Sequence, residues 1–247
     1  SSRRRHTRYI SVTGVQTCAL PICEIAGIHL EGPYLSHHRC GAHEPTLLRL
    51  PNLDEIKSLL DVGNGAIAMV TIAPELPGAI EVIKYLEKNR IIAAIGHTDG
   101  DANDAAAAID AGARVVTHFT NAMSKLSDGK DSFAQRVLDD PRINLELIVD
   151  GVHISLAQVA GIFEKAPNRI ILISDAMSAA GNPDGDYKIG SLDVEVRQSV
   201  ARLKSNGALA GSTLTLTRAA ENAMRAGVPK VLVDHATTSA PMALLLH

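Results

Sequence analysis

From Ile25 onward the chain alternates short, strongly apolar runs with segments whose apolar residues recur at helical spacing. Near-continuous hydrophobicity is typical of strands that are buried on both faces, and strands separated by helices are typical of a parallel sheet with crossover connections. Six strands are expected in the segments AGIHLEGPYL, AIAMVTIAPE, IIAAIGHTDG, RVVTHFTNAM, NLELIVDGVHI and RIILISDAMS. The expected helices between them are DEIKSLLDVG, GAIEVIKYLEKN, DANDAAAAIDAG, FAQRVLDD and LAQVAGIFEKA.

The alternation of strand and helix patterns ends after the sixth expected strand. Residues 181–212 are rich in Gly, Asn and Asp between short alternating runs, which predicts a hairpin-rich excursion. The segment TLTRAAENAMRAG then predicts a helix, and the last stretch is helical in pattern on both sides of Pro241.

Six strand and helix units are two fewer than an eight-stranded barrel contains. We therefore predict an α/β fold, an incomplete TIM-type (β/α)8 barrel with a small hairpin excursion near residues 181–212. The alternative is a doubly wound open sheet. That fold typically carries a Gly-rich phosphate loop after its first strand, and GPYLSHHRCG is not such a loop.

Bulk properties exclude some classes of function. The chain has 247 residues, 46% of them hydrophobic, which is enough to bury a sizeable core. Its formal net charge of -3 provides no broad basic excess for nucleic acid or an acidic membrane surface. All three cysteines lie in the first forty residues, so a reducing, cytoplasmic environment is favoured over a disulfide framework. No apolar run approaches the ~20 residues of a membrane span.

The first segment differs from the remainder of the chain. It has no initial methionine, it opens with a basic cluster, and its apolar pattern does not continue beyond Cys23. Its apolar stretch is too short and polar for a secretory signal. We interpret residues 1–23 as a non-native leader and residues 24–247 as a partial barrel.

Ionisable residues gather where the apolar runs end. Because the carboxyl ends of parallel strands face the same way, side chains that are distant in sequence are expected to meet there. A carboxylate and two neutral imidazoles suit Zn²⁺ or a similar divalent ion and leave a position open for water, as in a catalytic site. The residues at these positions are Glu31, His97, His118, His153 and Asp175.

Eight segments of the chain stand out as motifs: GIHLEGPYL, GAHEP, TIAPE, GHTDGD, THFTNAMSKL, VDGVH, ISDAMSAAG and LAGSTLTLTRAA. Together they resemble the N-acetylglucosamine-6-phosphate deacetylases, which belong to the amidohydrolases. The motifs occur in the family's order from about Ile25 to the end of the chain, and the combination of HLEGP, THFTNAM and SDAM is specific. The resemblance implies that residues 24–247 form a partial metal-dependent hydrolase barrel.

The resemblance implies roles for individual residues. Glu31, His97 and His118 would bind a catalytic divalent ion, with zinc first and iron or another ion as alternatives. Asp175 would act as general base and then general acid in hydrolysis of the N-acetyl group, which gives acetate and glucosamine 6-phosphate. The residues implied in substrate binding are His43, Asn121, Ala122, His153 and Leu209, the last in a loop that ends at Ser212.

The chain also departs from the family pattern. The first two barrel strands and the segment after the final helix are not recognisable, so truncation at both ends is expected. SKLSDGKDSF stands where the family carries an arginine-containing phosphate segment, and Lys130 is the basic residue there. Lys offers a point charge rather than a bidentate fork. The alternatives are therefore action on another N-acyl amino sugar, or an inactive fragment. The resemblance implies a homodimer for a full-length protein.

Overall fold

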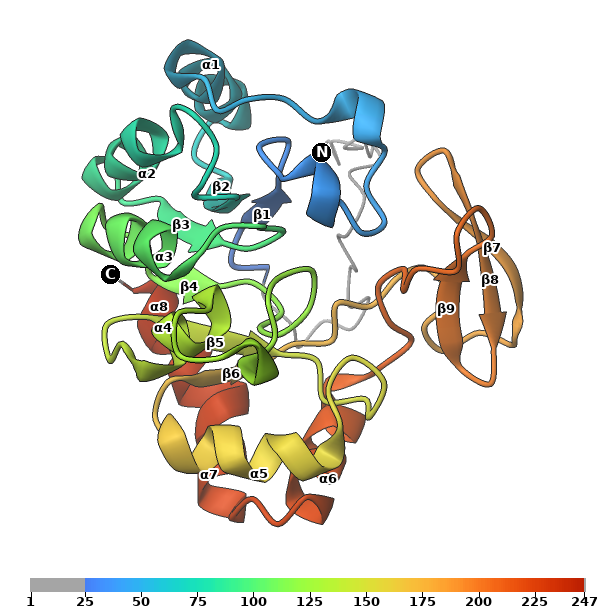
Figure 1. Cartoon of the computed structure of the whole chain (residues 1–247). Coiled ribbons are helices and arrows are strands. Elements are labelled where there is room, and N and C mark those ends of the chain that lie inside the picture. Colours follow the sequence, from blue (N-terminus) through green and yellow to red (C-terminus); the bar gives the residue numbers. More distant parts are fainter. Residues whose placement is uncertain (1–24, 247) are drawn as a thin grey trace, which may run out of the picture.

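The structure is a computed structural model, and it describes residues 25–246 (Figure 1). The predicted leader, residues 1–23, lies outside the described residues. Across residues 25–246, no helix has the length and apolar character that crossing a membrane requires.

All six predicted strands form one parallel sheet. The strands pair in sequence order, and each is joined to the next by a helical crossover. A doubly wound sheet reverses its strand order part-way, so this consecutive order disagrees with that alternative. The strands are β1 (Ile28–Glu31), β2 (Ile67–Ile72), β3 (Ile92–Ile95), β4 (Val115–Val116), β5 (Asn144–Leu147) and β6 (Ile170–Leu172).

The predicted crossover helices are also present, and Figure 1 shows them along the outer side of the curved sheet. Three of the five crossover helices, the first, third and fourth, begin with a side-chain cap. The side chain of Asn52 accepts hydrogen bonds from the backbone at Asp54 and Glu55 and so begins the first helix. The helices are α1 (Leu53–Gly63), α2 (Ala79–Lys88), α3 (Ala102–Asp110), α4 (Phe133–Asp139), α5 (Leu156–Lys165), α6 (Leu216–Arg225), α7 (Lys230–Asp234) and α8 (Ala240–Leu245).

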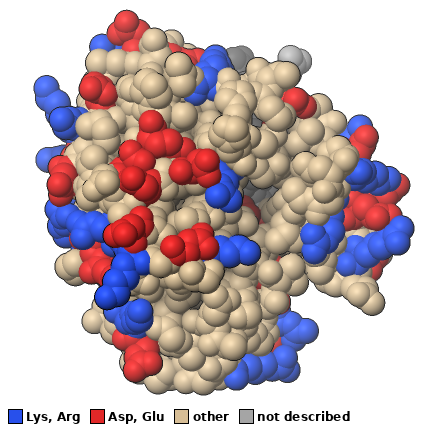
Figure 2. Space-filling model, in the orientation of Figure 1, with Lys and Arg blue, Asp and Glu red and all other residues tan. Residues whose placement is uncertain are grey.

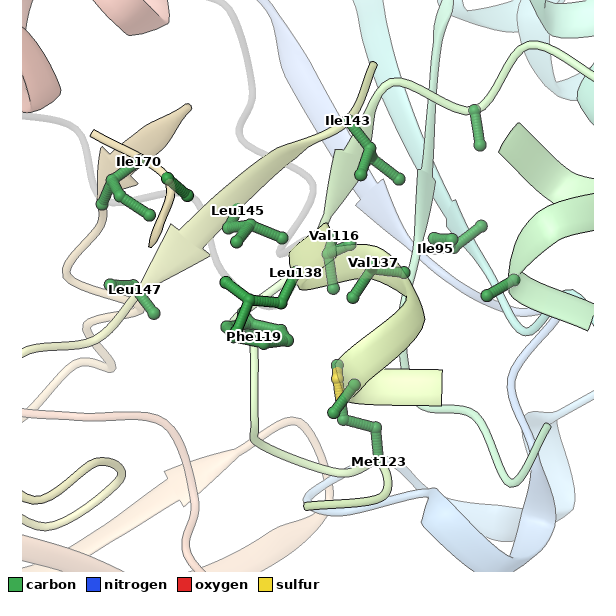
Figure 3. Packing of buried hydrophobic residues seen from close by; sticks show 14 of the residues in the cluster. Ile95, Val116, Phe119, Met123, Val137, Leu138, Ile143, Leu145, Leu147 and Ile170 are labelled. Carbon is green, nitrogen blue, oxygen red and sulfur yellow. The ribbon is translucent and has the colours of Figure 1, made fainter. Parts of the chain in front are cut away.

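The main core lies between the sheet and these helices. Figure 3 shows part of it, where Val137 and Leu138 of α4 pack near Val116 of β4 and Leu145 of β5. All four side chains are at most 2% exposed. Because successive strand residues point to opposite faces, this packing uses only every second residue of each strand.

The other face of the sheet has two layers that position the site. Near the amino ends of the strands, α8 covers it, since Ala240 and Leu244 pack with Ala94, Val115 and Ile171 in a small apolar cluster. Nearer the carboxyl ends the same face becomes polar. The side chains of His29, Thr71 and Thr117 form a hydrogen-bonded chain there, with both links 2.7 Å long.

The predicted hairpin excursion forms a separate three-stranded antiparallel sheet of β7 (Gly185–Ile189), β8 (Leu192–Arg197) and β9 (Val200–Leu203). It lies to the right in Figure 1, apart from the helices. Its small core includes Met177 and Ala210. Met177 lies in the segment between β6 and the excursion, and Ala210 lies in the segment between the excursion and α6. The small sheet therefore packs against the chain shortly after β6.

The surface shows no single-sign field on the face drawn in Figure 2, where acidic and basic side chains are interspersed over the helices and the small sheet. This agrees with the formal net charge of -3. Capture of a charged small molecule would therefore depend on local side chains.

Candidate metal centre

The site residues lie at the carboxyl ends of four strands of the parallel sheet. Glu31 is the last residue of β1, while His97 and His118 follow β3 and β4, and Asp175 follows β6. The last three have positive φ angles of 49°, 32° and 45°. Non-glycine residues adopt this conformation rarely and at a cost of roughly 1–3 kcal/mol each. Three such residues at the carboxyl ends of one sheet indicate a candidate functional site.

Glu31, His97 and His118 meet around one point. The Oε1 atom of Glu31 lies 2.9 Å from Nε2 of His97 and 2.8 Å from Nε2 of His118. The two imidazole nitrogens are 3.0 Å apart. Both histidine side chains are almost fully buried, at 6% and 3% exposed. The convergence predicted from the sequence is thus present in the geometry.

The contact of Nδ1 of His97, the ring nitrogen that faces away from Glu31, fixes the tautomer of the ring. Nδ1 lies 2.7 Å from the backbone carbonyl oxygen of Arg39. That oxygen can only accept a hydrogen bond, so Nδ1 carries the proton and Nε2 of the neutral ring presents a lone pair. A backbone carbonyl on the outer nitrogen is the usual support for a metal-binding histidine.

The pKa values reflect the same convergence. Burial acts to raise the pKa of Glu31, but its close contacts with the imidazole nitrogens of His118 and His97 hold the pKa well below its usual range. For His118, burial acts to lower the pKa, yet the hydrogen bond to Glu31 raises it to about 9. A positive charge between these side chains is therefore strongly favoured.

A divalent ion fits this donor set. The three facing atoms are a carboxylate oxygen and two imidazole nitrogens, which are ordinary ligands of such an ion, and Nε2 of His97 presents a lone pair. Ligand atoms of a tetrahedral zinc ion lie roughly 3.4 Å apart, given bonds of about 2.1 Å. The observed separations of 2.8–3.0 Å are slightly tighter. The structure therefore has a possible His/Glu metal site.

His43 lies beside the other carboxylate oxygen of Glu31. Its Nε2 is 3.6 Å from Oε2 of Glu31, and its ring centroid is 4.8 Å from that of His97. Glu31, His43 and His97 can offer ligand atoms within 4.8 Å of one another, which makes His43 a further candidate ligand. Burial, reinforced by His97, lowers the pKa of His43 to about 4, so its ring is neutral at pH 7.

Asp175 borders a cavity of about 300 Å³ together with Glu31 and His118. Burial, followed by the charge of Glu31, raises the pKa of Asp175 to about 6. The predicted loop that begins at Leu209 lies beside it, because the backbone N–H of Ser212 donates to the carbonyl oxygen of Asp175 over 2.7 Å. Leu209 itself is half-buried and bridges to β9.

The remaining predicted substrate residues surround this centre at different depths. Ala122 accepts a hydrogen bond from the backbone N–H of Thr98, next to His97, and Asn121 donates its backbone N–H to the carbonyl of His118. The side chain of His153 is only 4% exposed. Lys130, by contrast, is exposed in the loop before α4.

Sequence reasoning missed two inward-facing residues. His29 and Glu146 line the same cavity as Asp175. Burial lowers the pKa of His29 to about 4 and raises the pKa of Glu146 to about 7. The signal was available, because His29 stands two residues before Glu31 and so shares its face of the strand.

Glu75, in the segment TIAPE, anchors the loop that follows β3. Its carboxylate accepts a 2.5 Å hydrogen bond from Thr98 and a 2.8 Å bond from the backbone N–H of Asp99. Both partners directly follow His97. Glu75 therefore holds the loop on which His97 is carried.

The fold and the site together define an α/β protein with a candidate mononuclear metal centre at the carboxyl ends of its parallel strands. Such a centre, with a carboxylate of raised pKa beside it, is the arrangement of a metal-dependent hydrolase.

Comparisons with known proteins identify particular relatives. An N-acetylglucosamine-6-phosphate deacetylase of Vibrio furnissii is 36% identical over 202 residues, which cover 82% of this chain and 50% of that protein. An N-acetylgalactosamine-6-phosphate deacetylase of Escherichia coli O157:H7 is 35% identical over 226 residues, covering 91% of the chain and 60% of that protein. No protein-family model matches the chain.

Solved structures agree with these relatives. An N-acetyl-D-glucosamine-6-phosphate deacetylase variant from Mycobacterium smegmatis, in complex with N-acetyl-D-glucosamine-6-phosphate, is 42% identical with a TM-score of 0.85. The match covers 89% of this chain and 59% of that one. A deacetylase from Thermotoga maritima is 31% identical with a TM-score of 0.83. The resemblance predicted from the motifs is confirmed, and the chain spans 50–60% of the length of these four relatives.

Proposed function

We propose that this chain carries the catalytic centre of a metal-dependent deacetylase that removes the N-acetyl group of N-acetylglucosamine 6-phosphate. The observation that carries the proposal is the meeting of Glu31, His97 and His118 within 3.0 Å of one another, next to Asp175. The names of the relatives supply the substrate class.

Glu31, His97 and His118 would hold the ion, and zinc is the ion that best suits one carboxylate and two imidazoles. When bound, it would acidify water and polarise the acetyl carbonyl oxygen. His43 faces the other oxygen of Glu31 at 3.6 Å, so we place it at the substrate side of the centre.

Asp175 would move the protons of the reaction. Its carboxyl group, with a pKa of about 6, is ionised at pH 7 and can accept a proton from water, yet it is basic enough to return that proton to the departing amine. Because an amine leaves poorly when it is unprotonated, this return is essential. His153, Asn121, Ala122 and the loop from Leu209 would contact the sugar phosphate.

The proposal also includes the barrel architecture, the oligomeric state and the cellular location. The consecutive, curved parallel sheet supports an incomplete barrel of six of the eight units, spanning residues 24–247. A homodimer is proposed on the resemblance alone, and a cytoplasmic location on the small number of cysteines.

The decisive assay is acetate release by the metal-loaded chain from N-acetylglucosamine 6-phosphate, with its galactosamine epimer and the unphosphorylated sugar as comparison substrates. Asp175→Asn should lower kcat by about 10²-fold or more while zinc remains bound. Absence of acetate release by a folded, metal-loaded chain would refute activity of this chain. Full activity of Asp175→Asn would refute the role of that residue.

A further inference from the structure

The turn after β5 ties a second carboxylate to His153. In the segment VDGVH, Oδ1 of Asp150 accepts hydrogen bonds from the backbone N–H groups of Val152 and His153, each 2.8 Å long. Oδ2 accepts a third from Nδ1 of the His153 ring, at 2.7 Å. The two carboxylate oxygens of Asp150 therefore bind different groups: Oδ1 binds the backbone of the turn, and Oδ2 binds the imidazole ring of His153.

This contact determines where the ring proton lies. An ionised carboxylate only accepts hydrogen bonds, so Nδ1 of His153 must carry the proton and Nε2 of the neutral ring presents a lone pair. Hydrogen bonds from His153 hold the pKa of Asp150 below its usual value, against the effect of burial, so the carboxylate stays ionised at neutral pH.

The other ring nitrogen is left for a ligand. Nε2 of His153 is buried and has no hydrogen-bond partner among residues 25–246. A buried polar atom without a partner costs about 1–3 kcal/mol, so such atoms usually have a use. His153 also lies close enough to Asp175 to affect the pKa of that carboxyl group electrostatically. The free nitrogen therefore belongs to the proposed active site.

We propose that Asp150 is a positioning residue that fixes His153 as its Nδ1–H tautomer, so that Nε2 accepts a hydrogen bond from a hydroxyl or amide N–H of the sugar substrate. The substrate part of this inference rests on the proposed deacetylase function. The tautomer part rests only on the contacts of Asp150.

Asp150→Asn separates the two tasks of the side chain. The amide oxygen can keep both backbone hydrogen bonds, while the amide NH₂ replaces Oδ2 and can only donate. Nδ1 of His153 must then accept, and the proton moves to Nε2. The turn stays intact while the nitrogen that faces the substrate changes from acceptor to donor.

The tautomer is read directly by ¹⁵N NMR of the histidine-labelled chain at pH 8, without metal or substrate, with the His153 signals assigned by their loss in His153→Gln. The wild type should show Nδ1–H and Asp150→Asn should show Nε2–H. Asp101→Asn is the matched control, since Oδ1 of Asp101 also accepts two backbone N–H groups but contacts no imidazole. It should leave His153 unchanged.

Kinetics then test the substrate part. Asp150→Asn should lower kcat/KM for N-acetylglucosamine 6-phosphate by about 10- to 100-fold, the value of one buried hydrogen bond, and Asp101→Asn should not. An Nε2–H tautomer in the wild type, or an unchanged tautomer in Asp150→Asn, would overturn the role of Asp150. If the tautomer inverts but kcat/KM stays constant, the substrate contact is wrong. If the wild type releases no acetate, the proposed function fails and the tautomer result stands by itself.

Discussion

Glu146 provides a sensitive test of the polar inner face of the sheet. It is 5% exposed and lines the cavity beside Asp175. Burial raises its pKa from 4.5 to about 7. In the unfolded chain this carboxyl ionises near pH 4.5, whereas in the folded chain it stays protonated until about pH 7. Between these values the folded state binds more protons, so the free energy of unfolding contributed by Glu146 falls as pH rises.

The magnitude comes from the shift of about 2.5 pKa units, which corresponds to roughly 3 kcal/mol. Glu146→Gln keeps the shape of the side chain but cannot ionise. We therefore expect the mutant to gain stability relative to the wild type by roughly 3 kcal/mol between pH 4.5 and 7, and no further gain above pH 7. Other groups, such as His29 with its lowered pKa, titrate in both proteins and cancel in the comparison.

The assay is urea unfolding of both proteins across pH 4–8 with a chelator present, because a bound cation would favour the ionised form. Glu164→Gln on the exposed side of α5 is the matched control and should change little at any pH. A pH-independent difference between wild type and Glu146→Gln would show that Glu146 ionises normally, and burial would not raise the pKa of its carboxyl group.

Three further predictions concern the support of the site and the core. Glu75→Gln should weaken divalent-metal affinity by about 10- to 100-fold in calorimetric titration, because the loop after His97 loses its carboxylate anchor; unchanged affinity would contradict this. Phe163→Ala should lower the free energy of unfolding by about 3–5 kcal/mol in urea, since the ring is 1% exposed in the main core; a loss below about 1 kcal/mol would refute tight packing there. Gly78→Ala should cost at least about 1 kcal/mol in the same assay, because φ is 88° and the new Cβ would lie 2.7 Å from the carbonyl oxygen of Pro51. Gly161→Ala, which meets no atom within 4 Å, is its control.

The sequence predicts the strand order and the site well where the signal is local. Each strand is a continuous apolar run, and the topology of a parallel sheet then brings Glu31, His97 and His118 together without further information. Strand length is harder to predict. The run around β4 suggested a long strand, but β4 is only Val115–Val116, because the chain turns at His118 with φ of 32°.

The sequence did not predict that the inner face of the sheet, which carries His29 and Glu146, lines a cavity. Alternation places His29 and Glu146 on one face of their strands, but it does not say whether that face meets apolar side chains or a cavity. The answer depends on α8, which covers only the part of this face near Ala94 and Val115. The link between Asp150 and His153 was likewise missed, since it depends on the shape of the turn after β5.

The most direct test of the account is metal binding by the full chain, measured as zinc affinity and stoichiometry by calorimetry and elemental analysis. We expect about one zinc ion per chain, and at least a 10²-fold loss of affinity in each of Glu31→Gln, His97→Gln and His118→Gln. His37→Gln, at an exposed position, should bind as the wild type does. A folded wild type that binds no zinc, or triple replacement of Glu31, His97 and His118 without loss of binding, would contradict the assignment of this site as a metal centre.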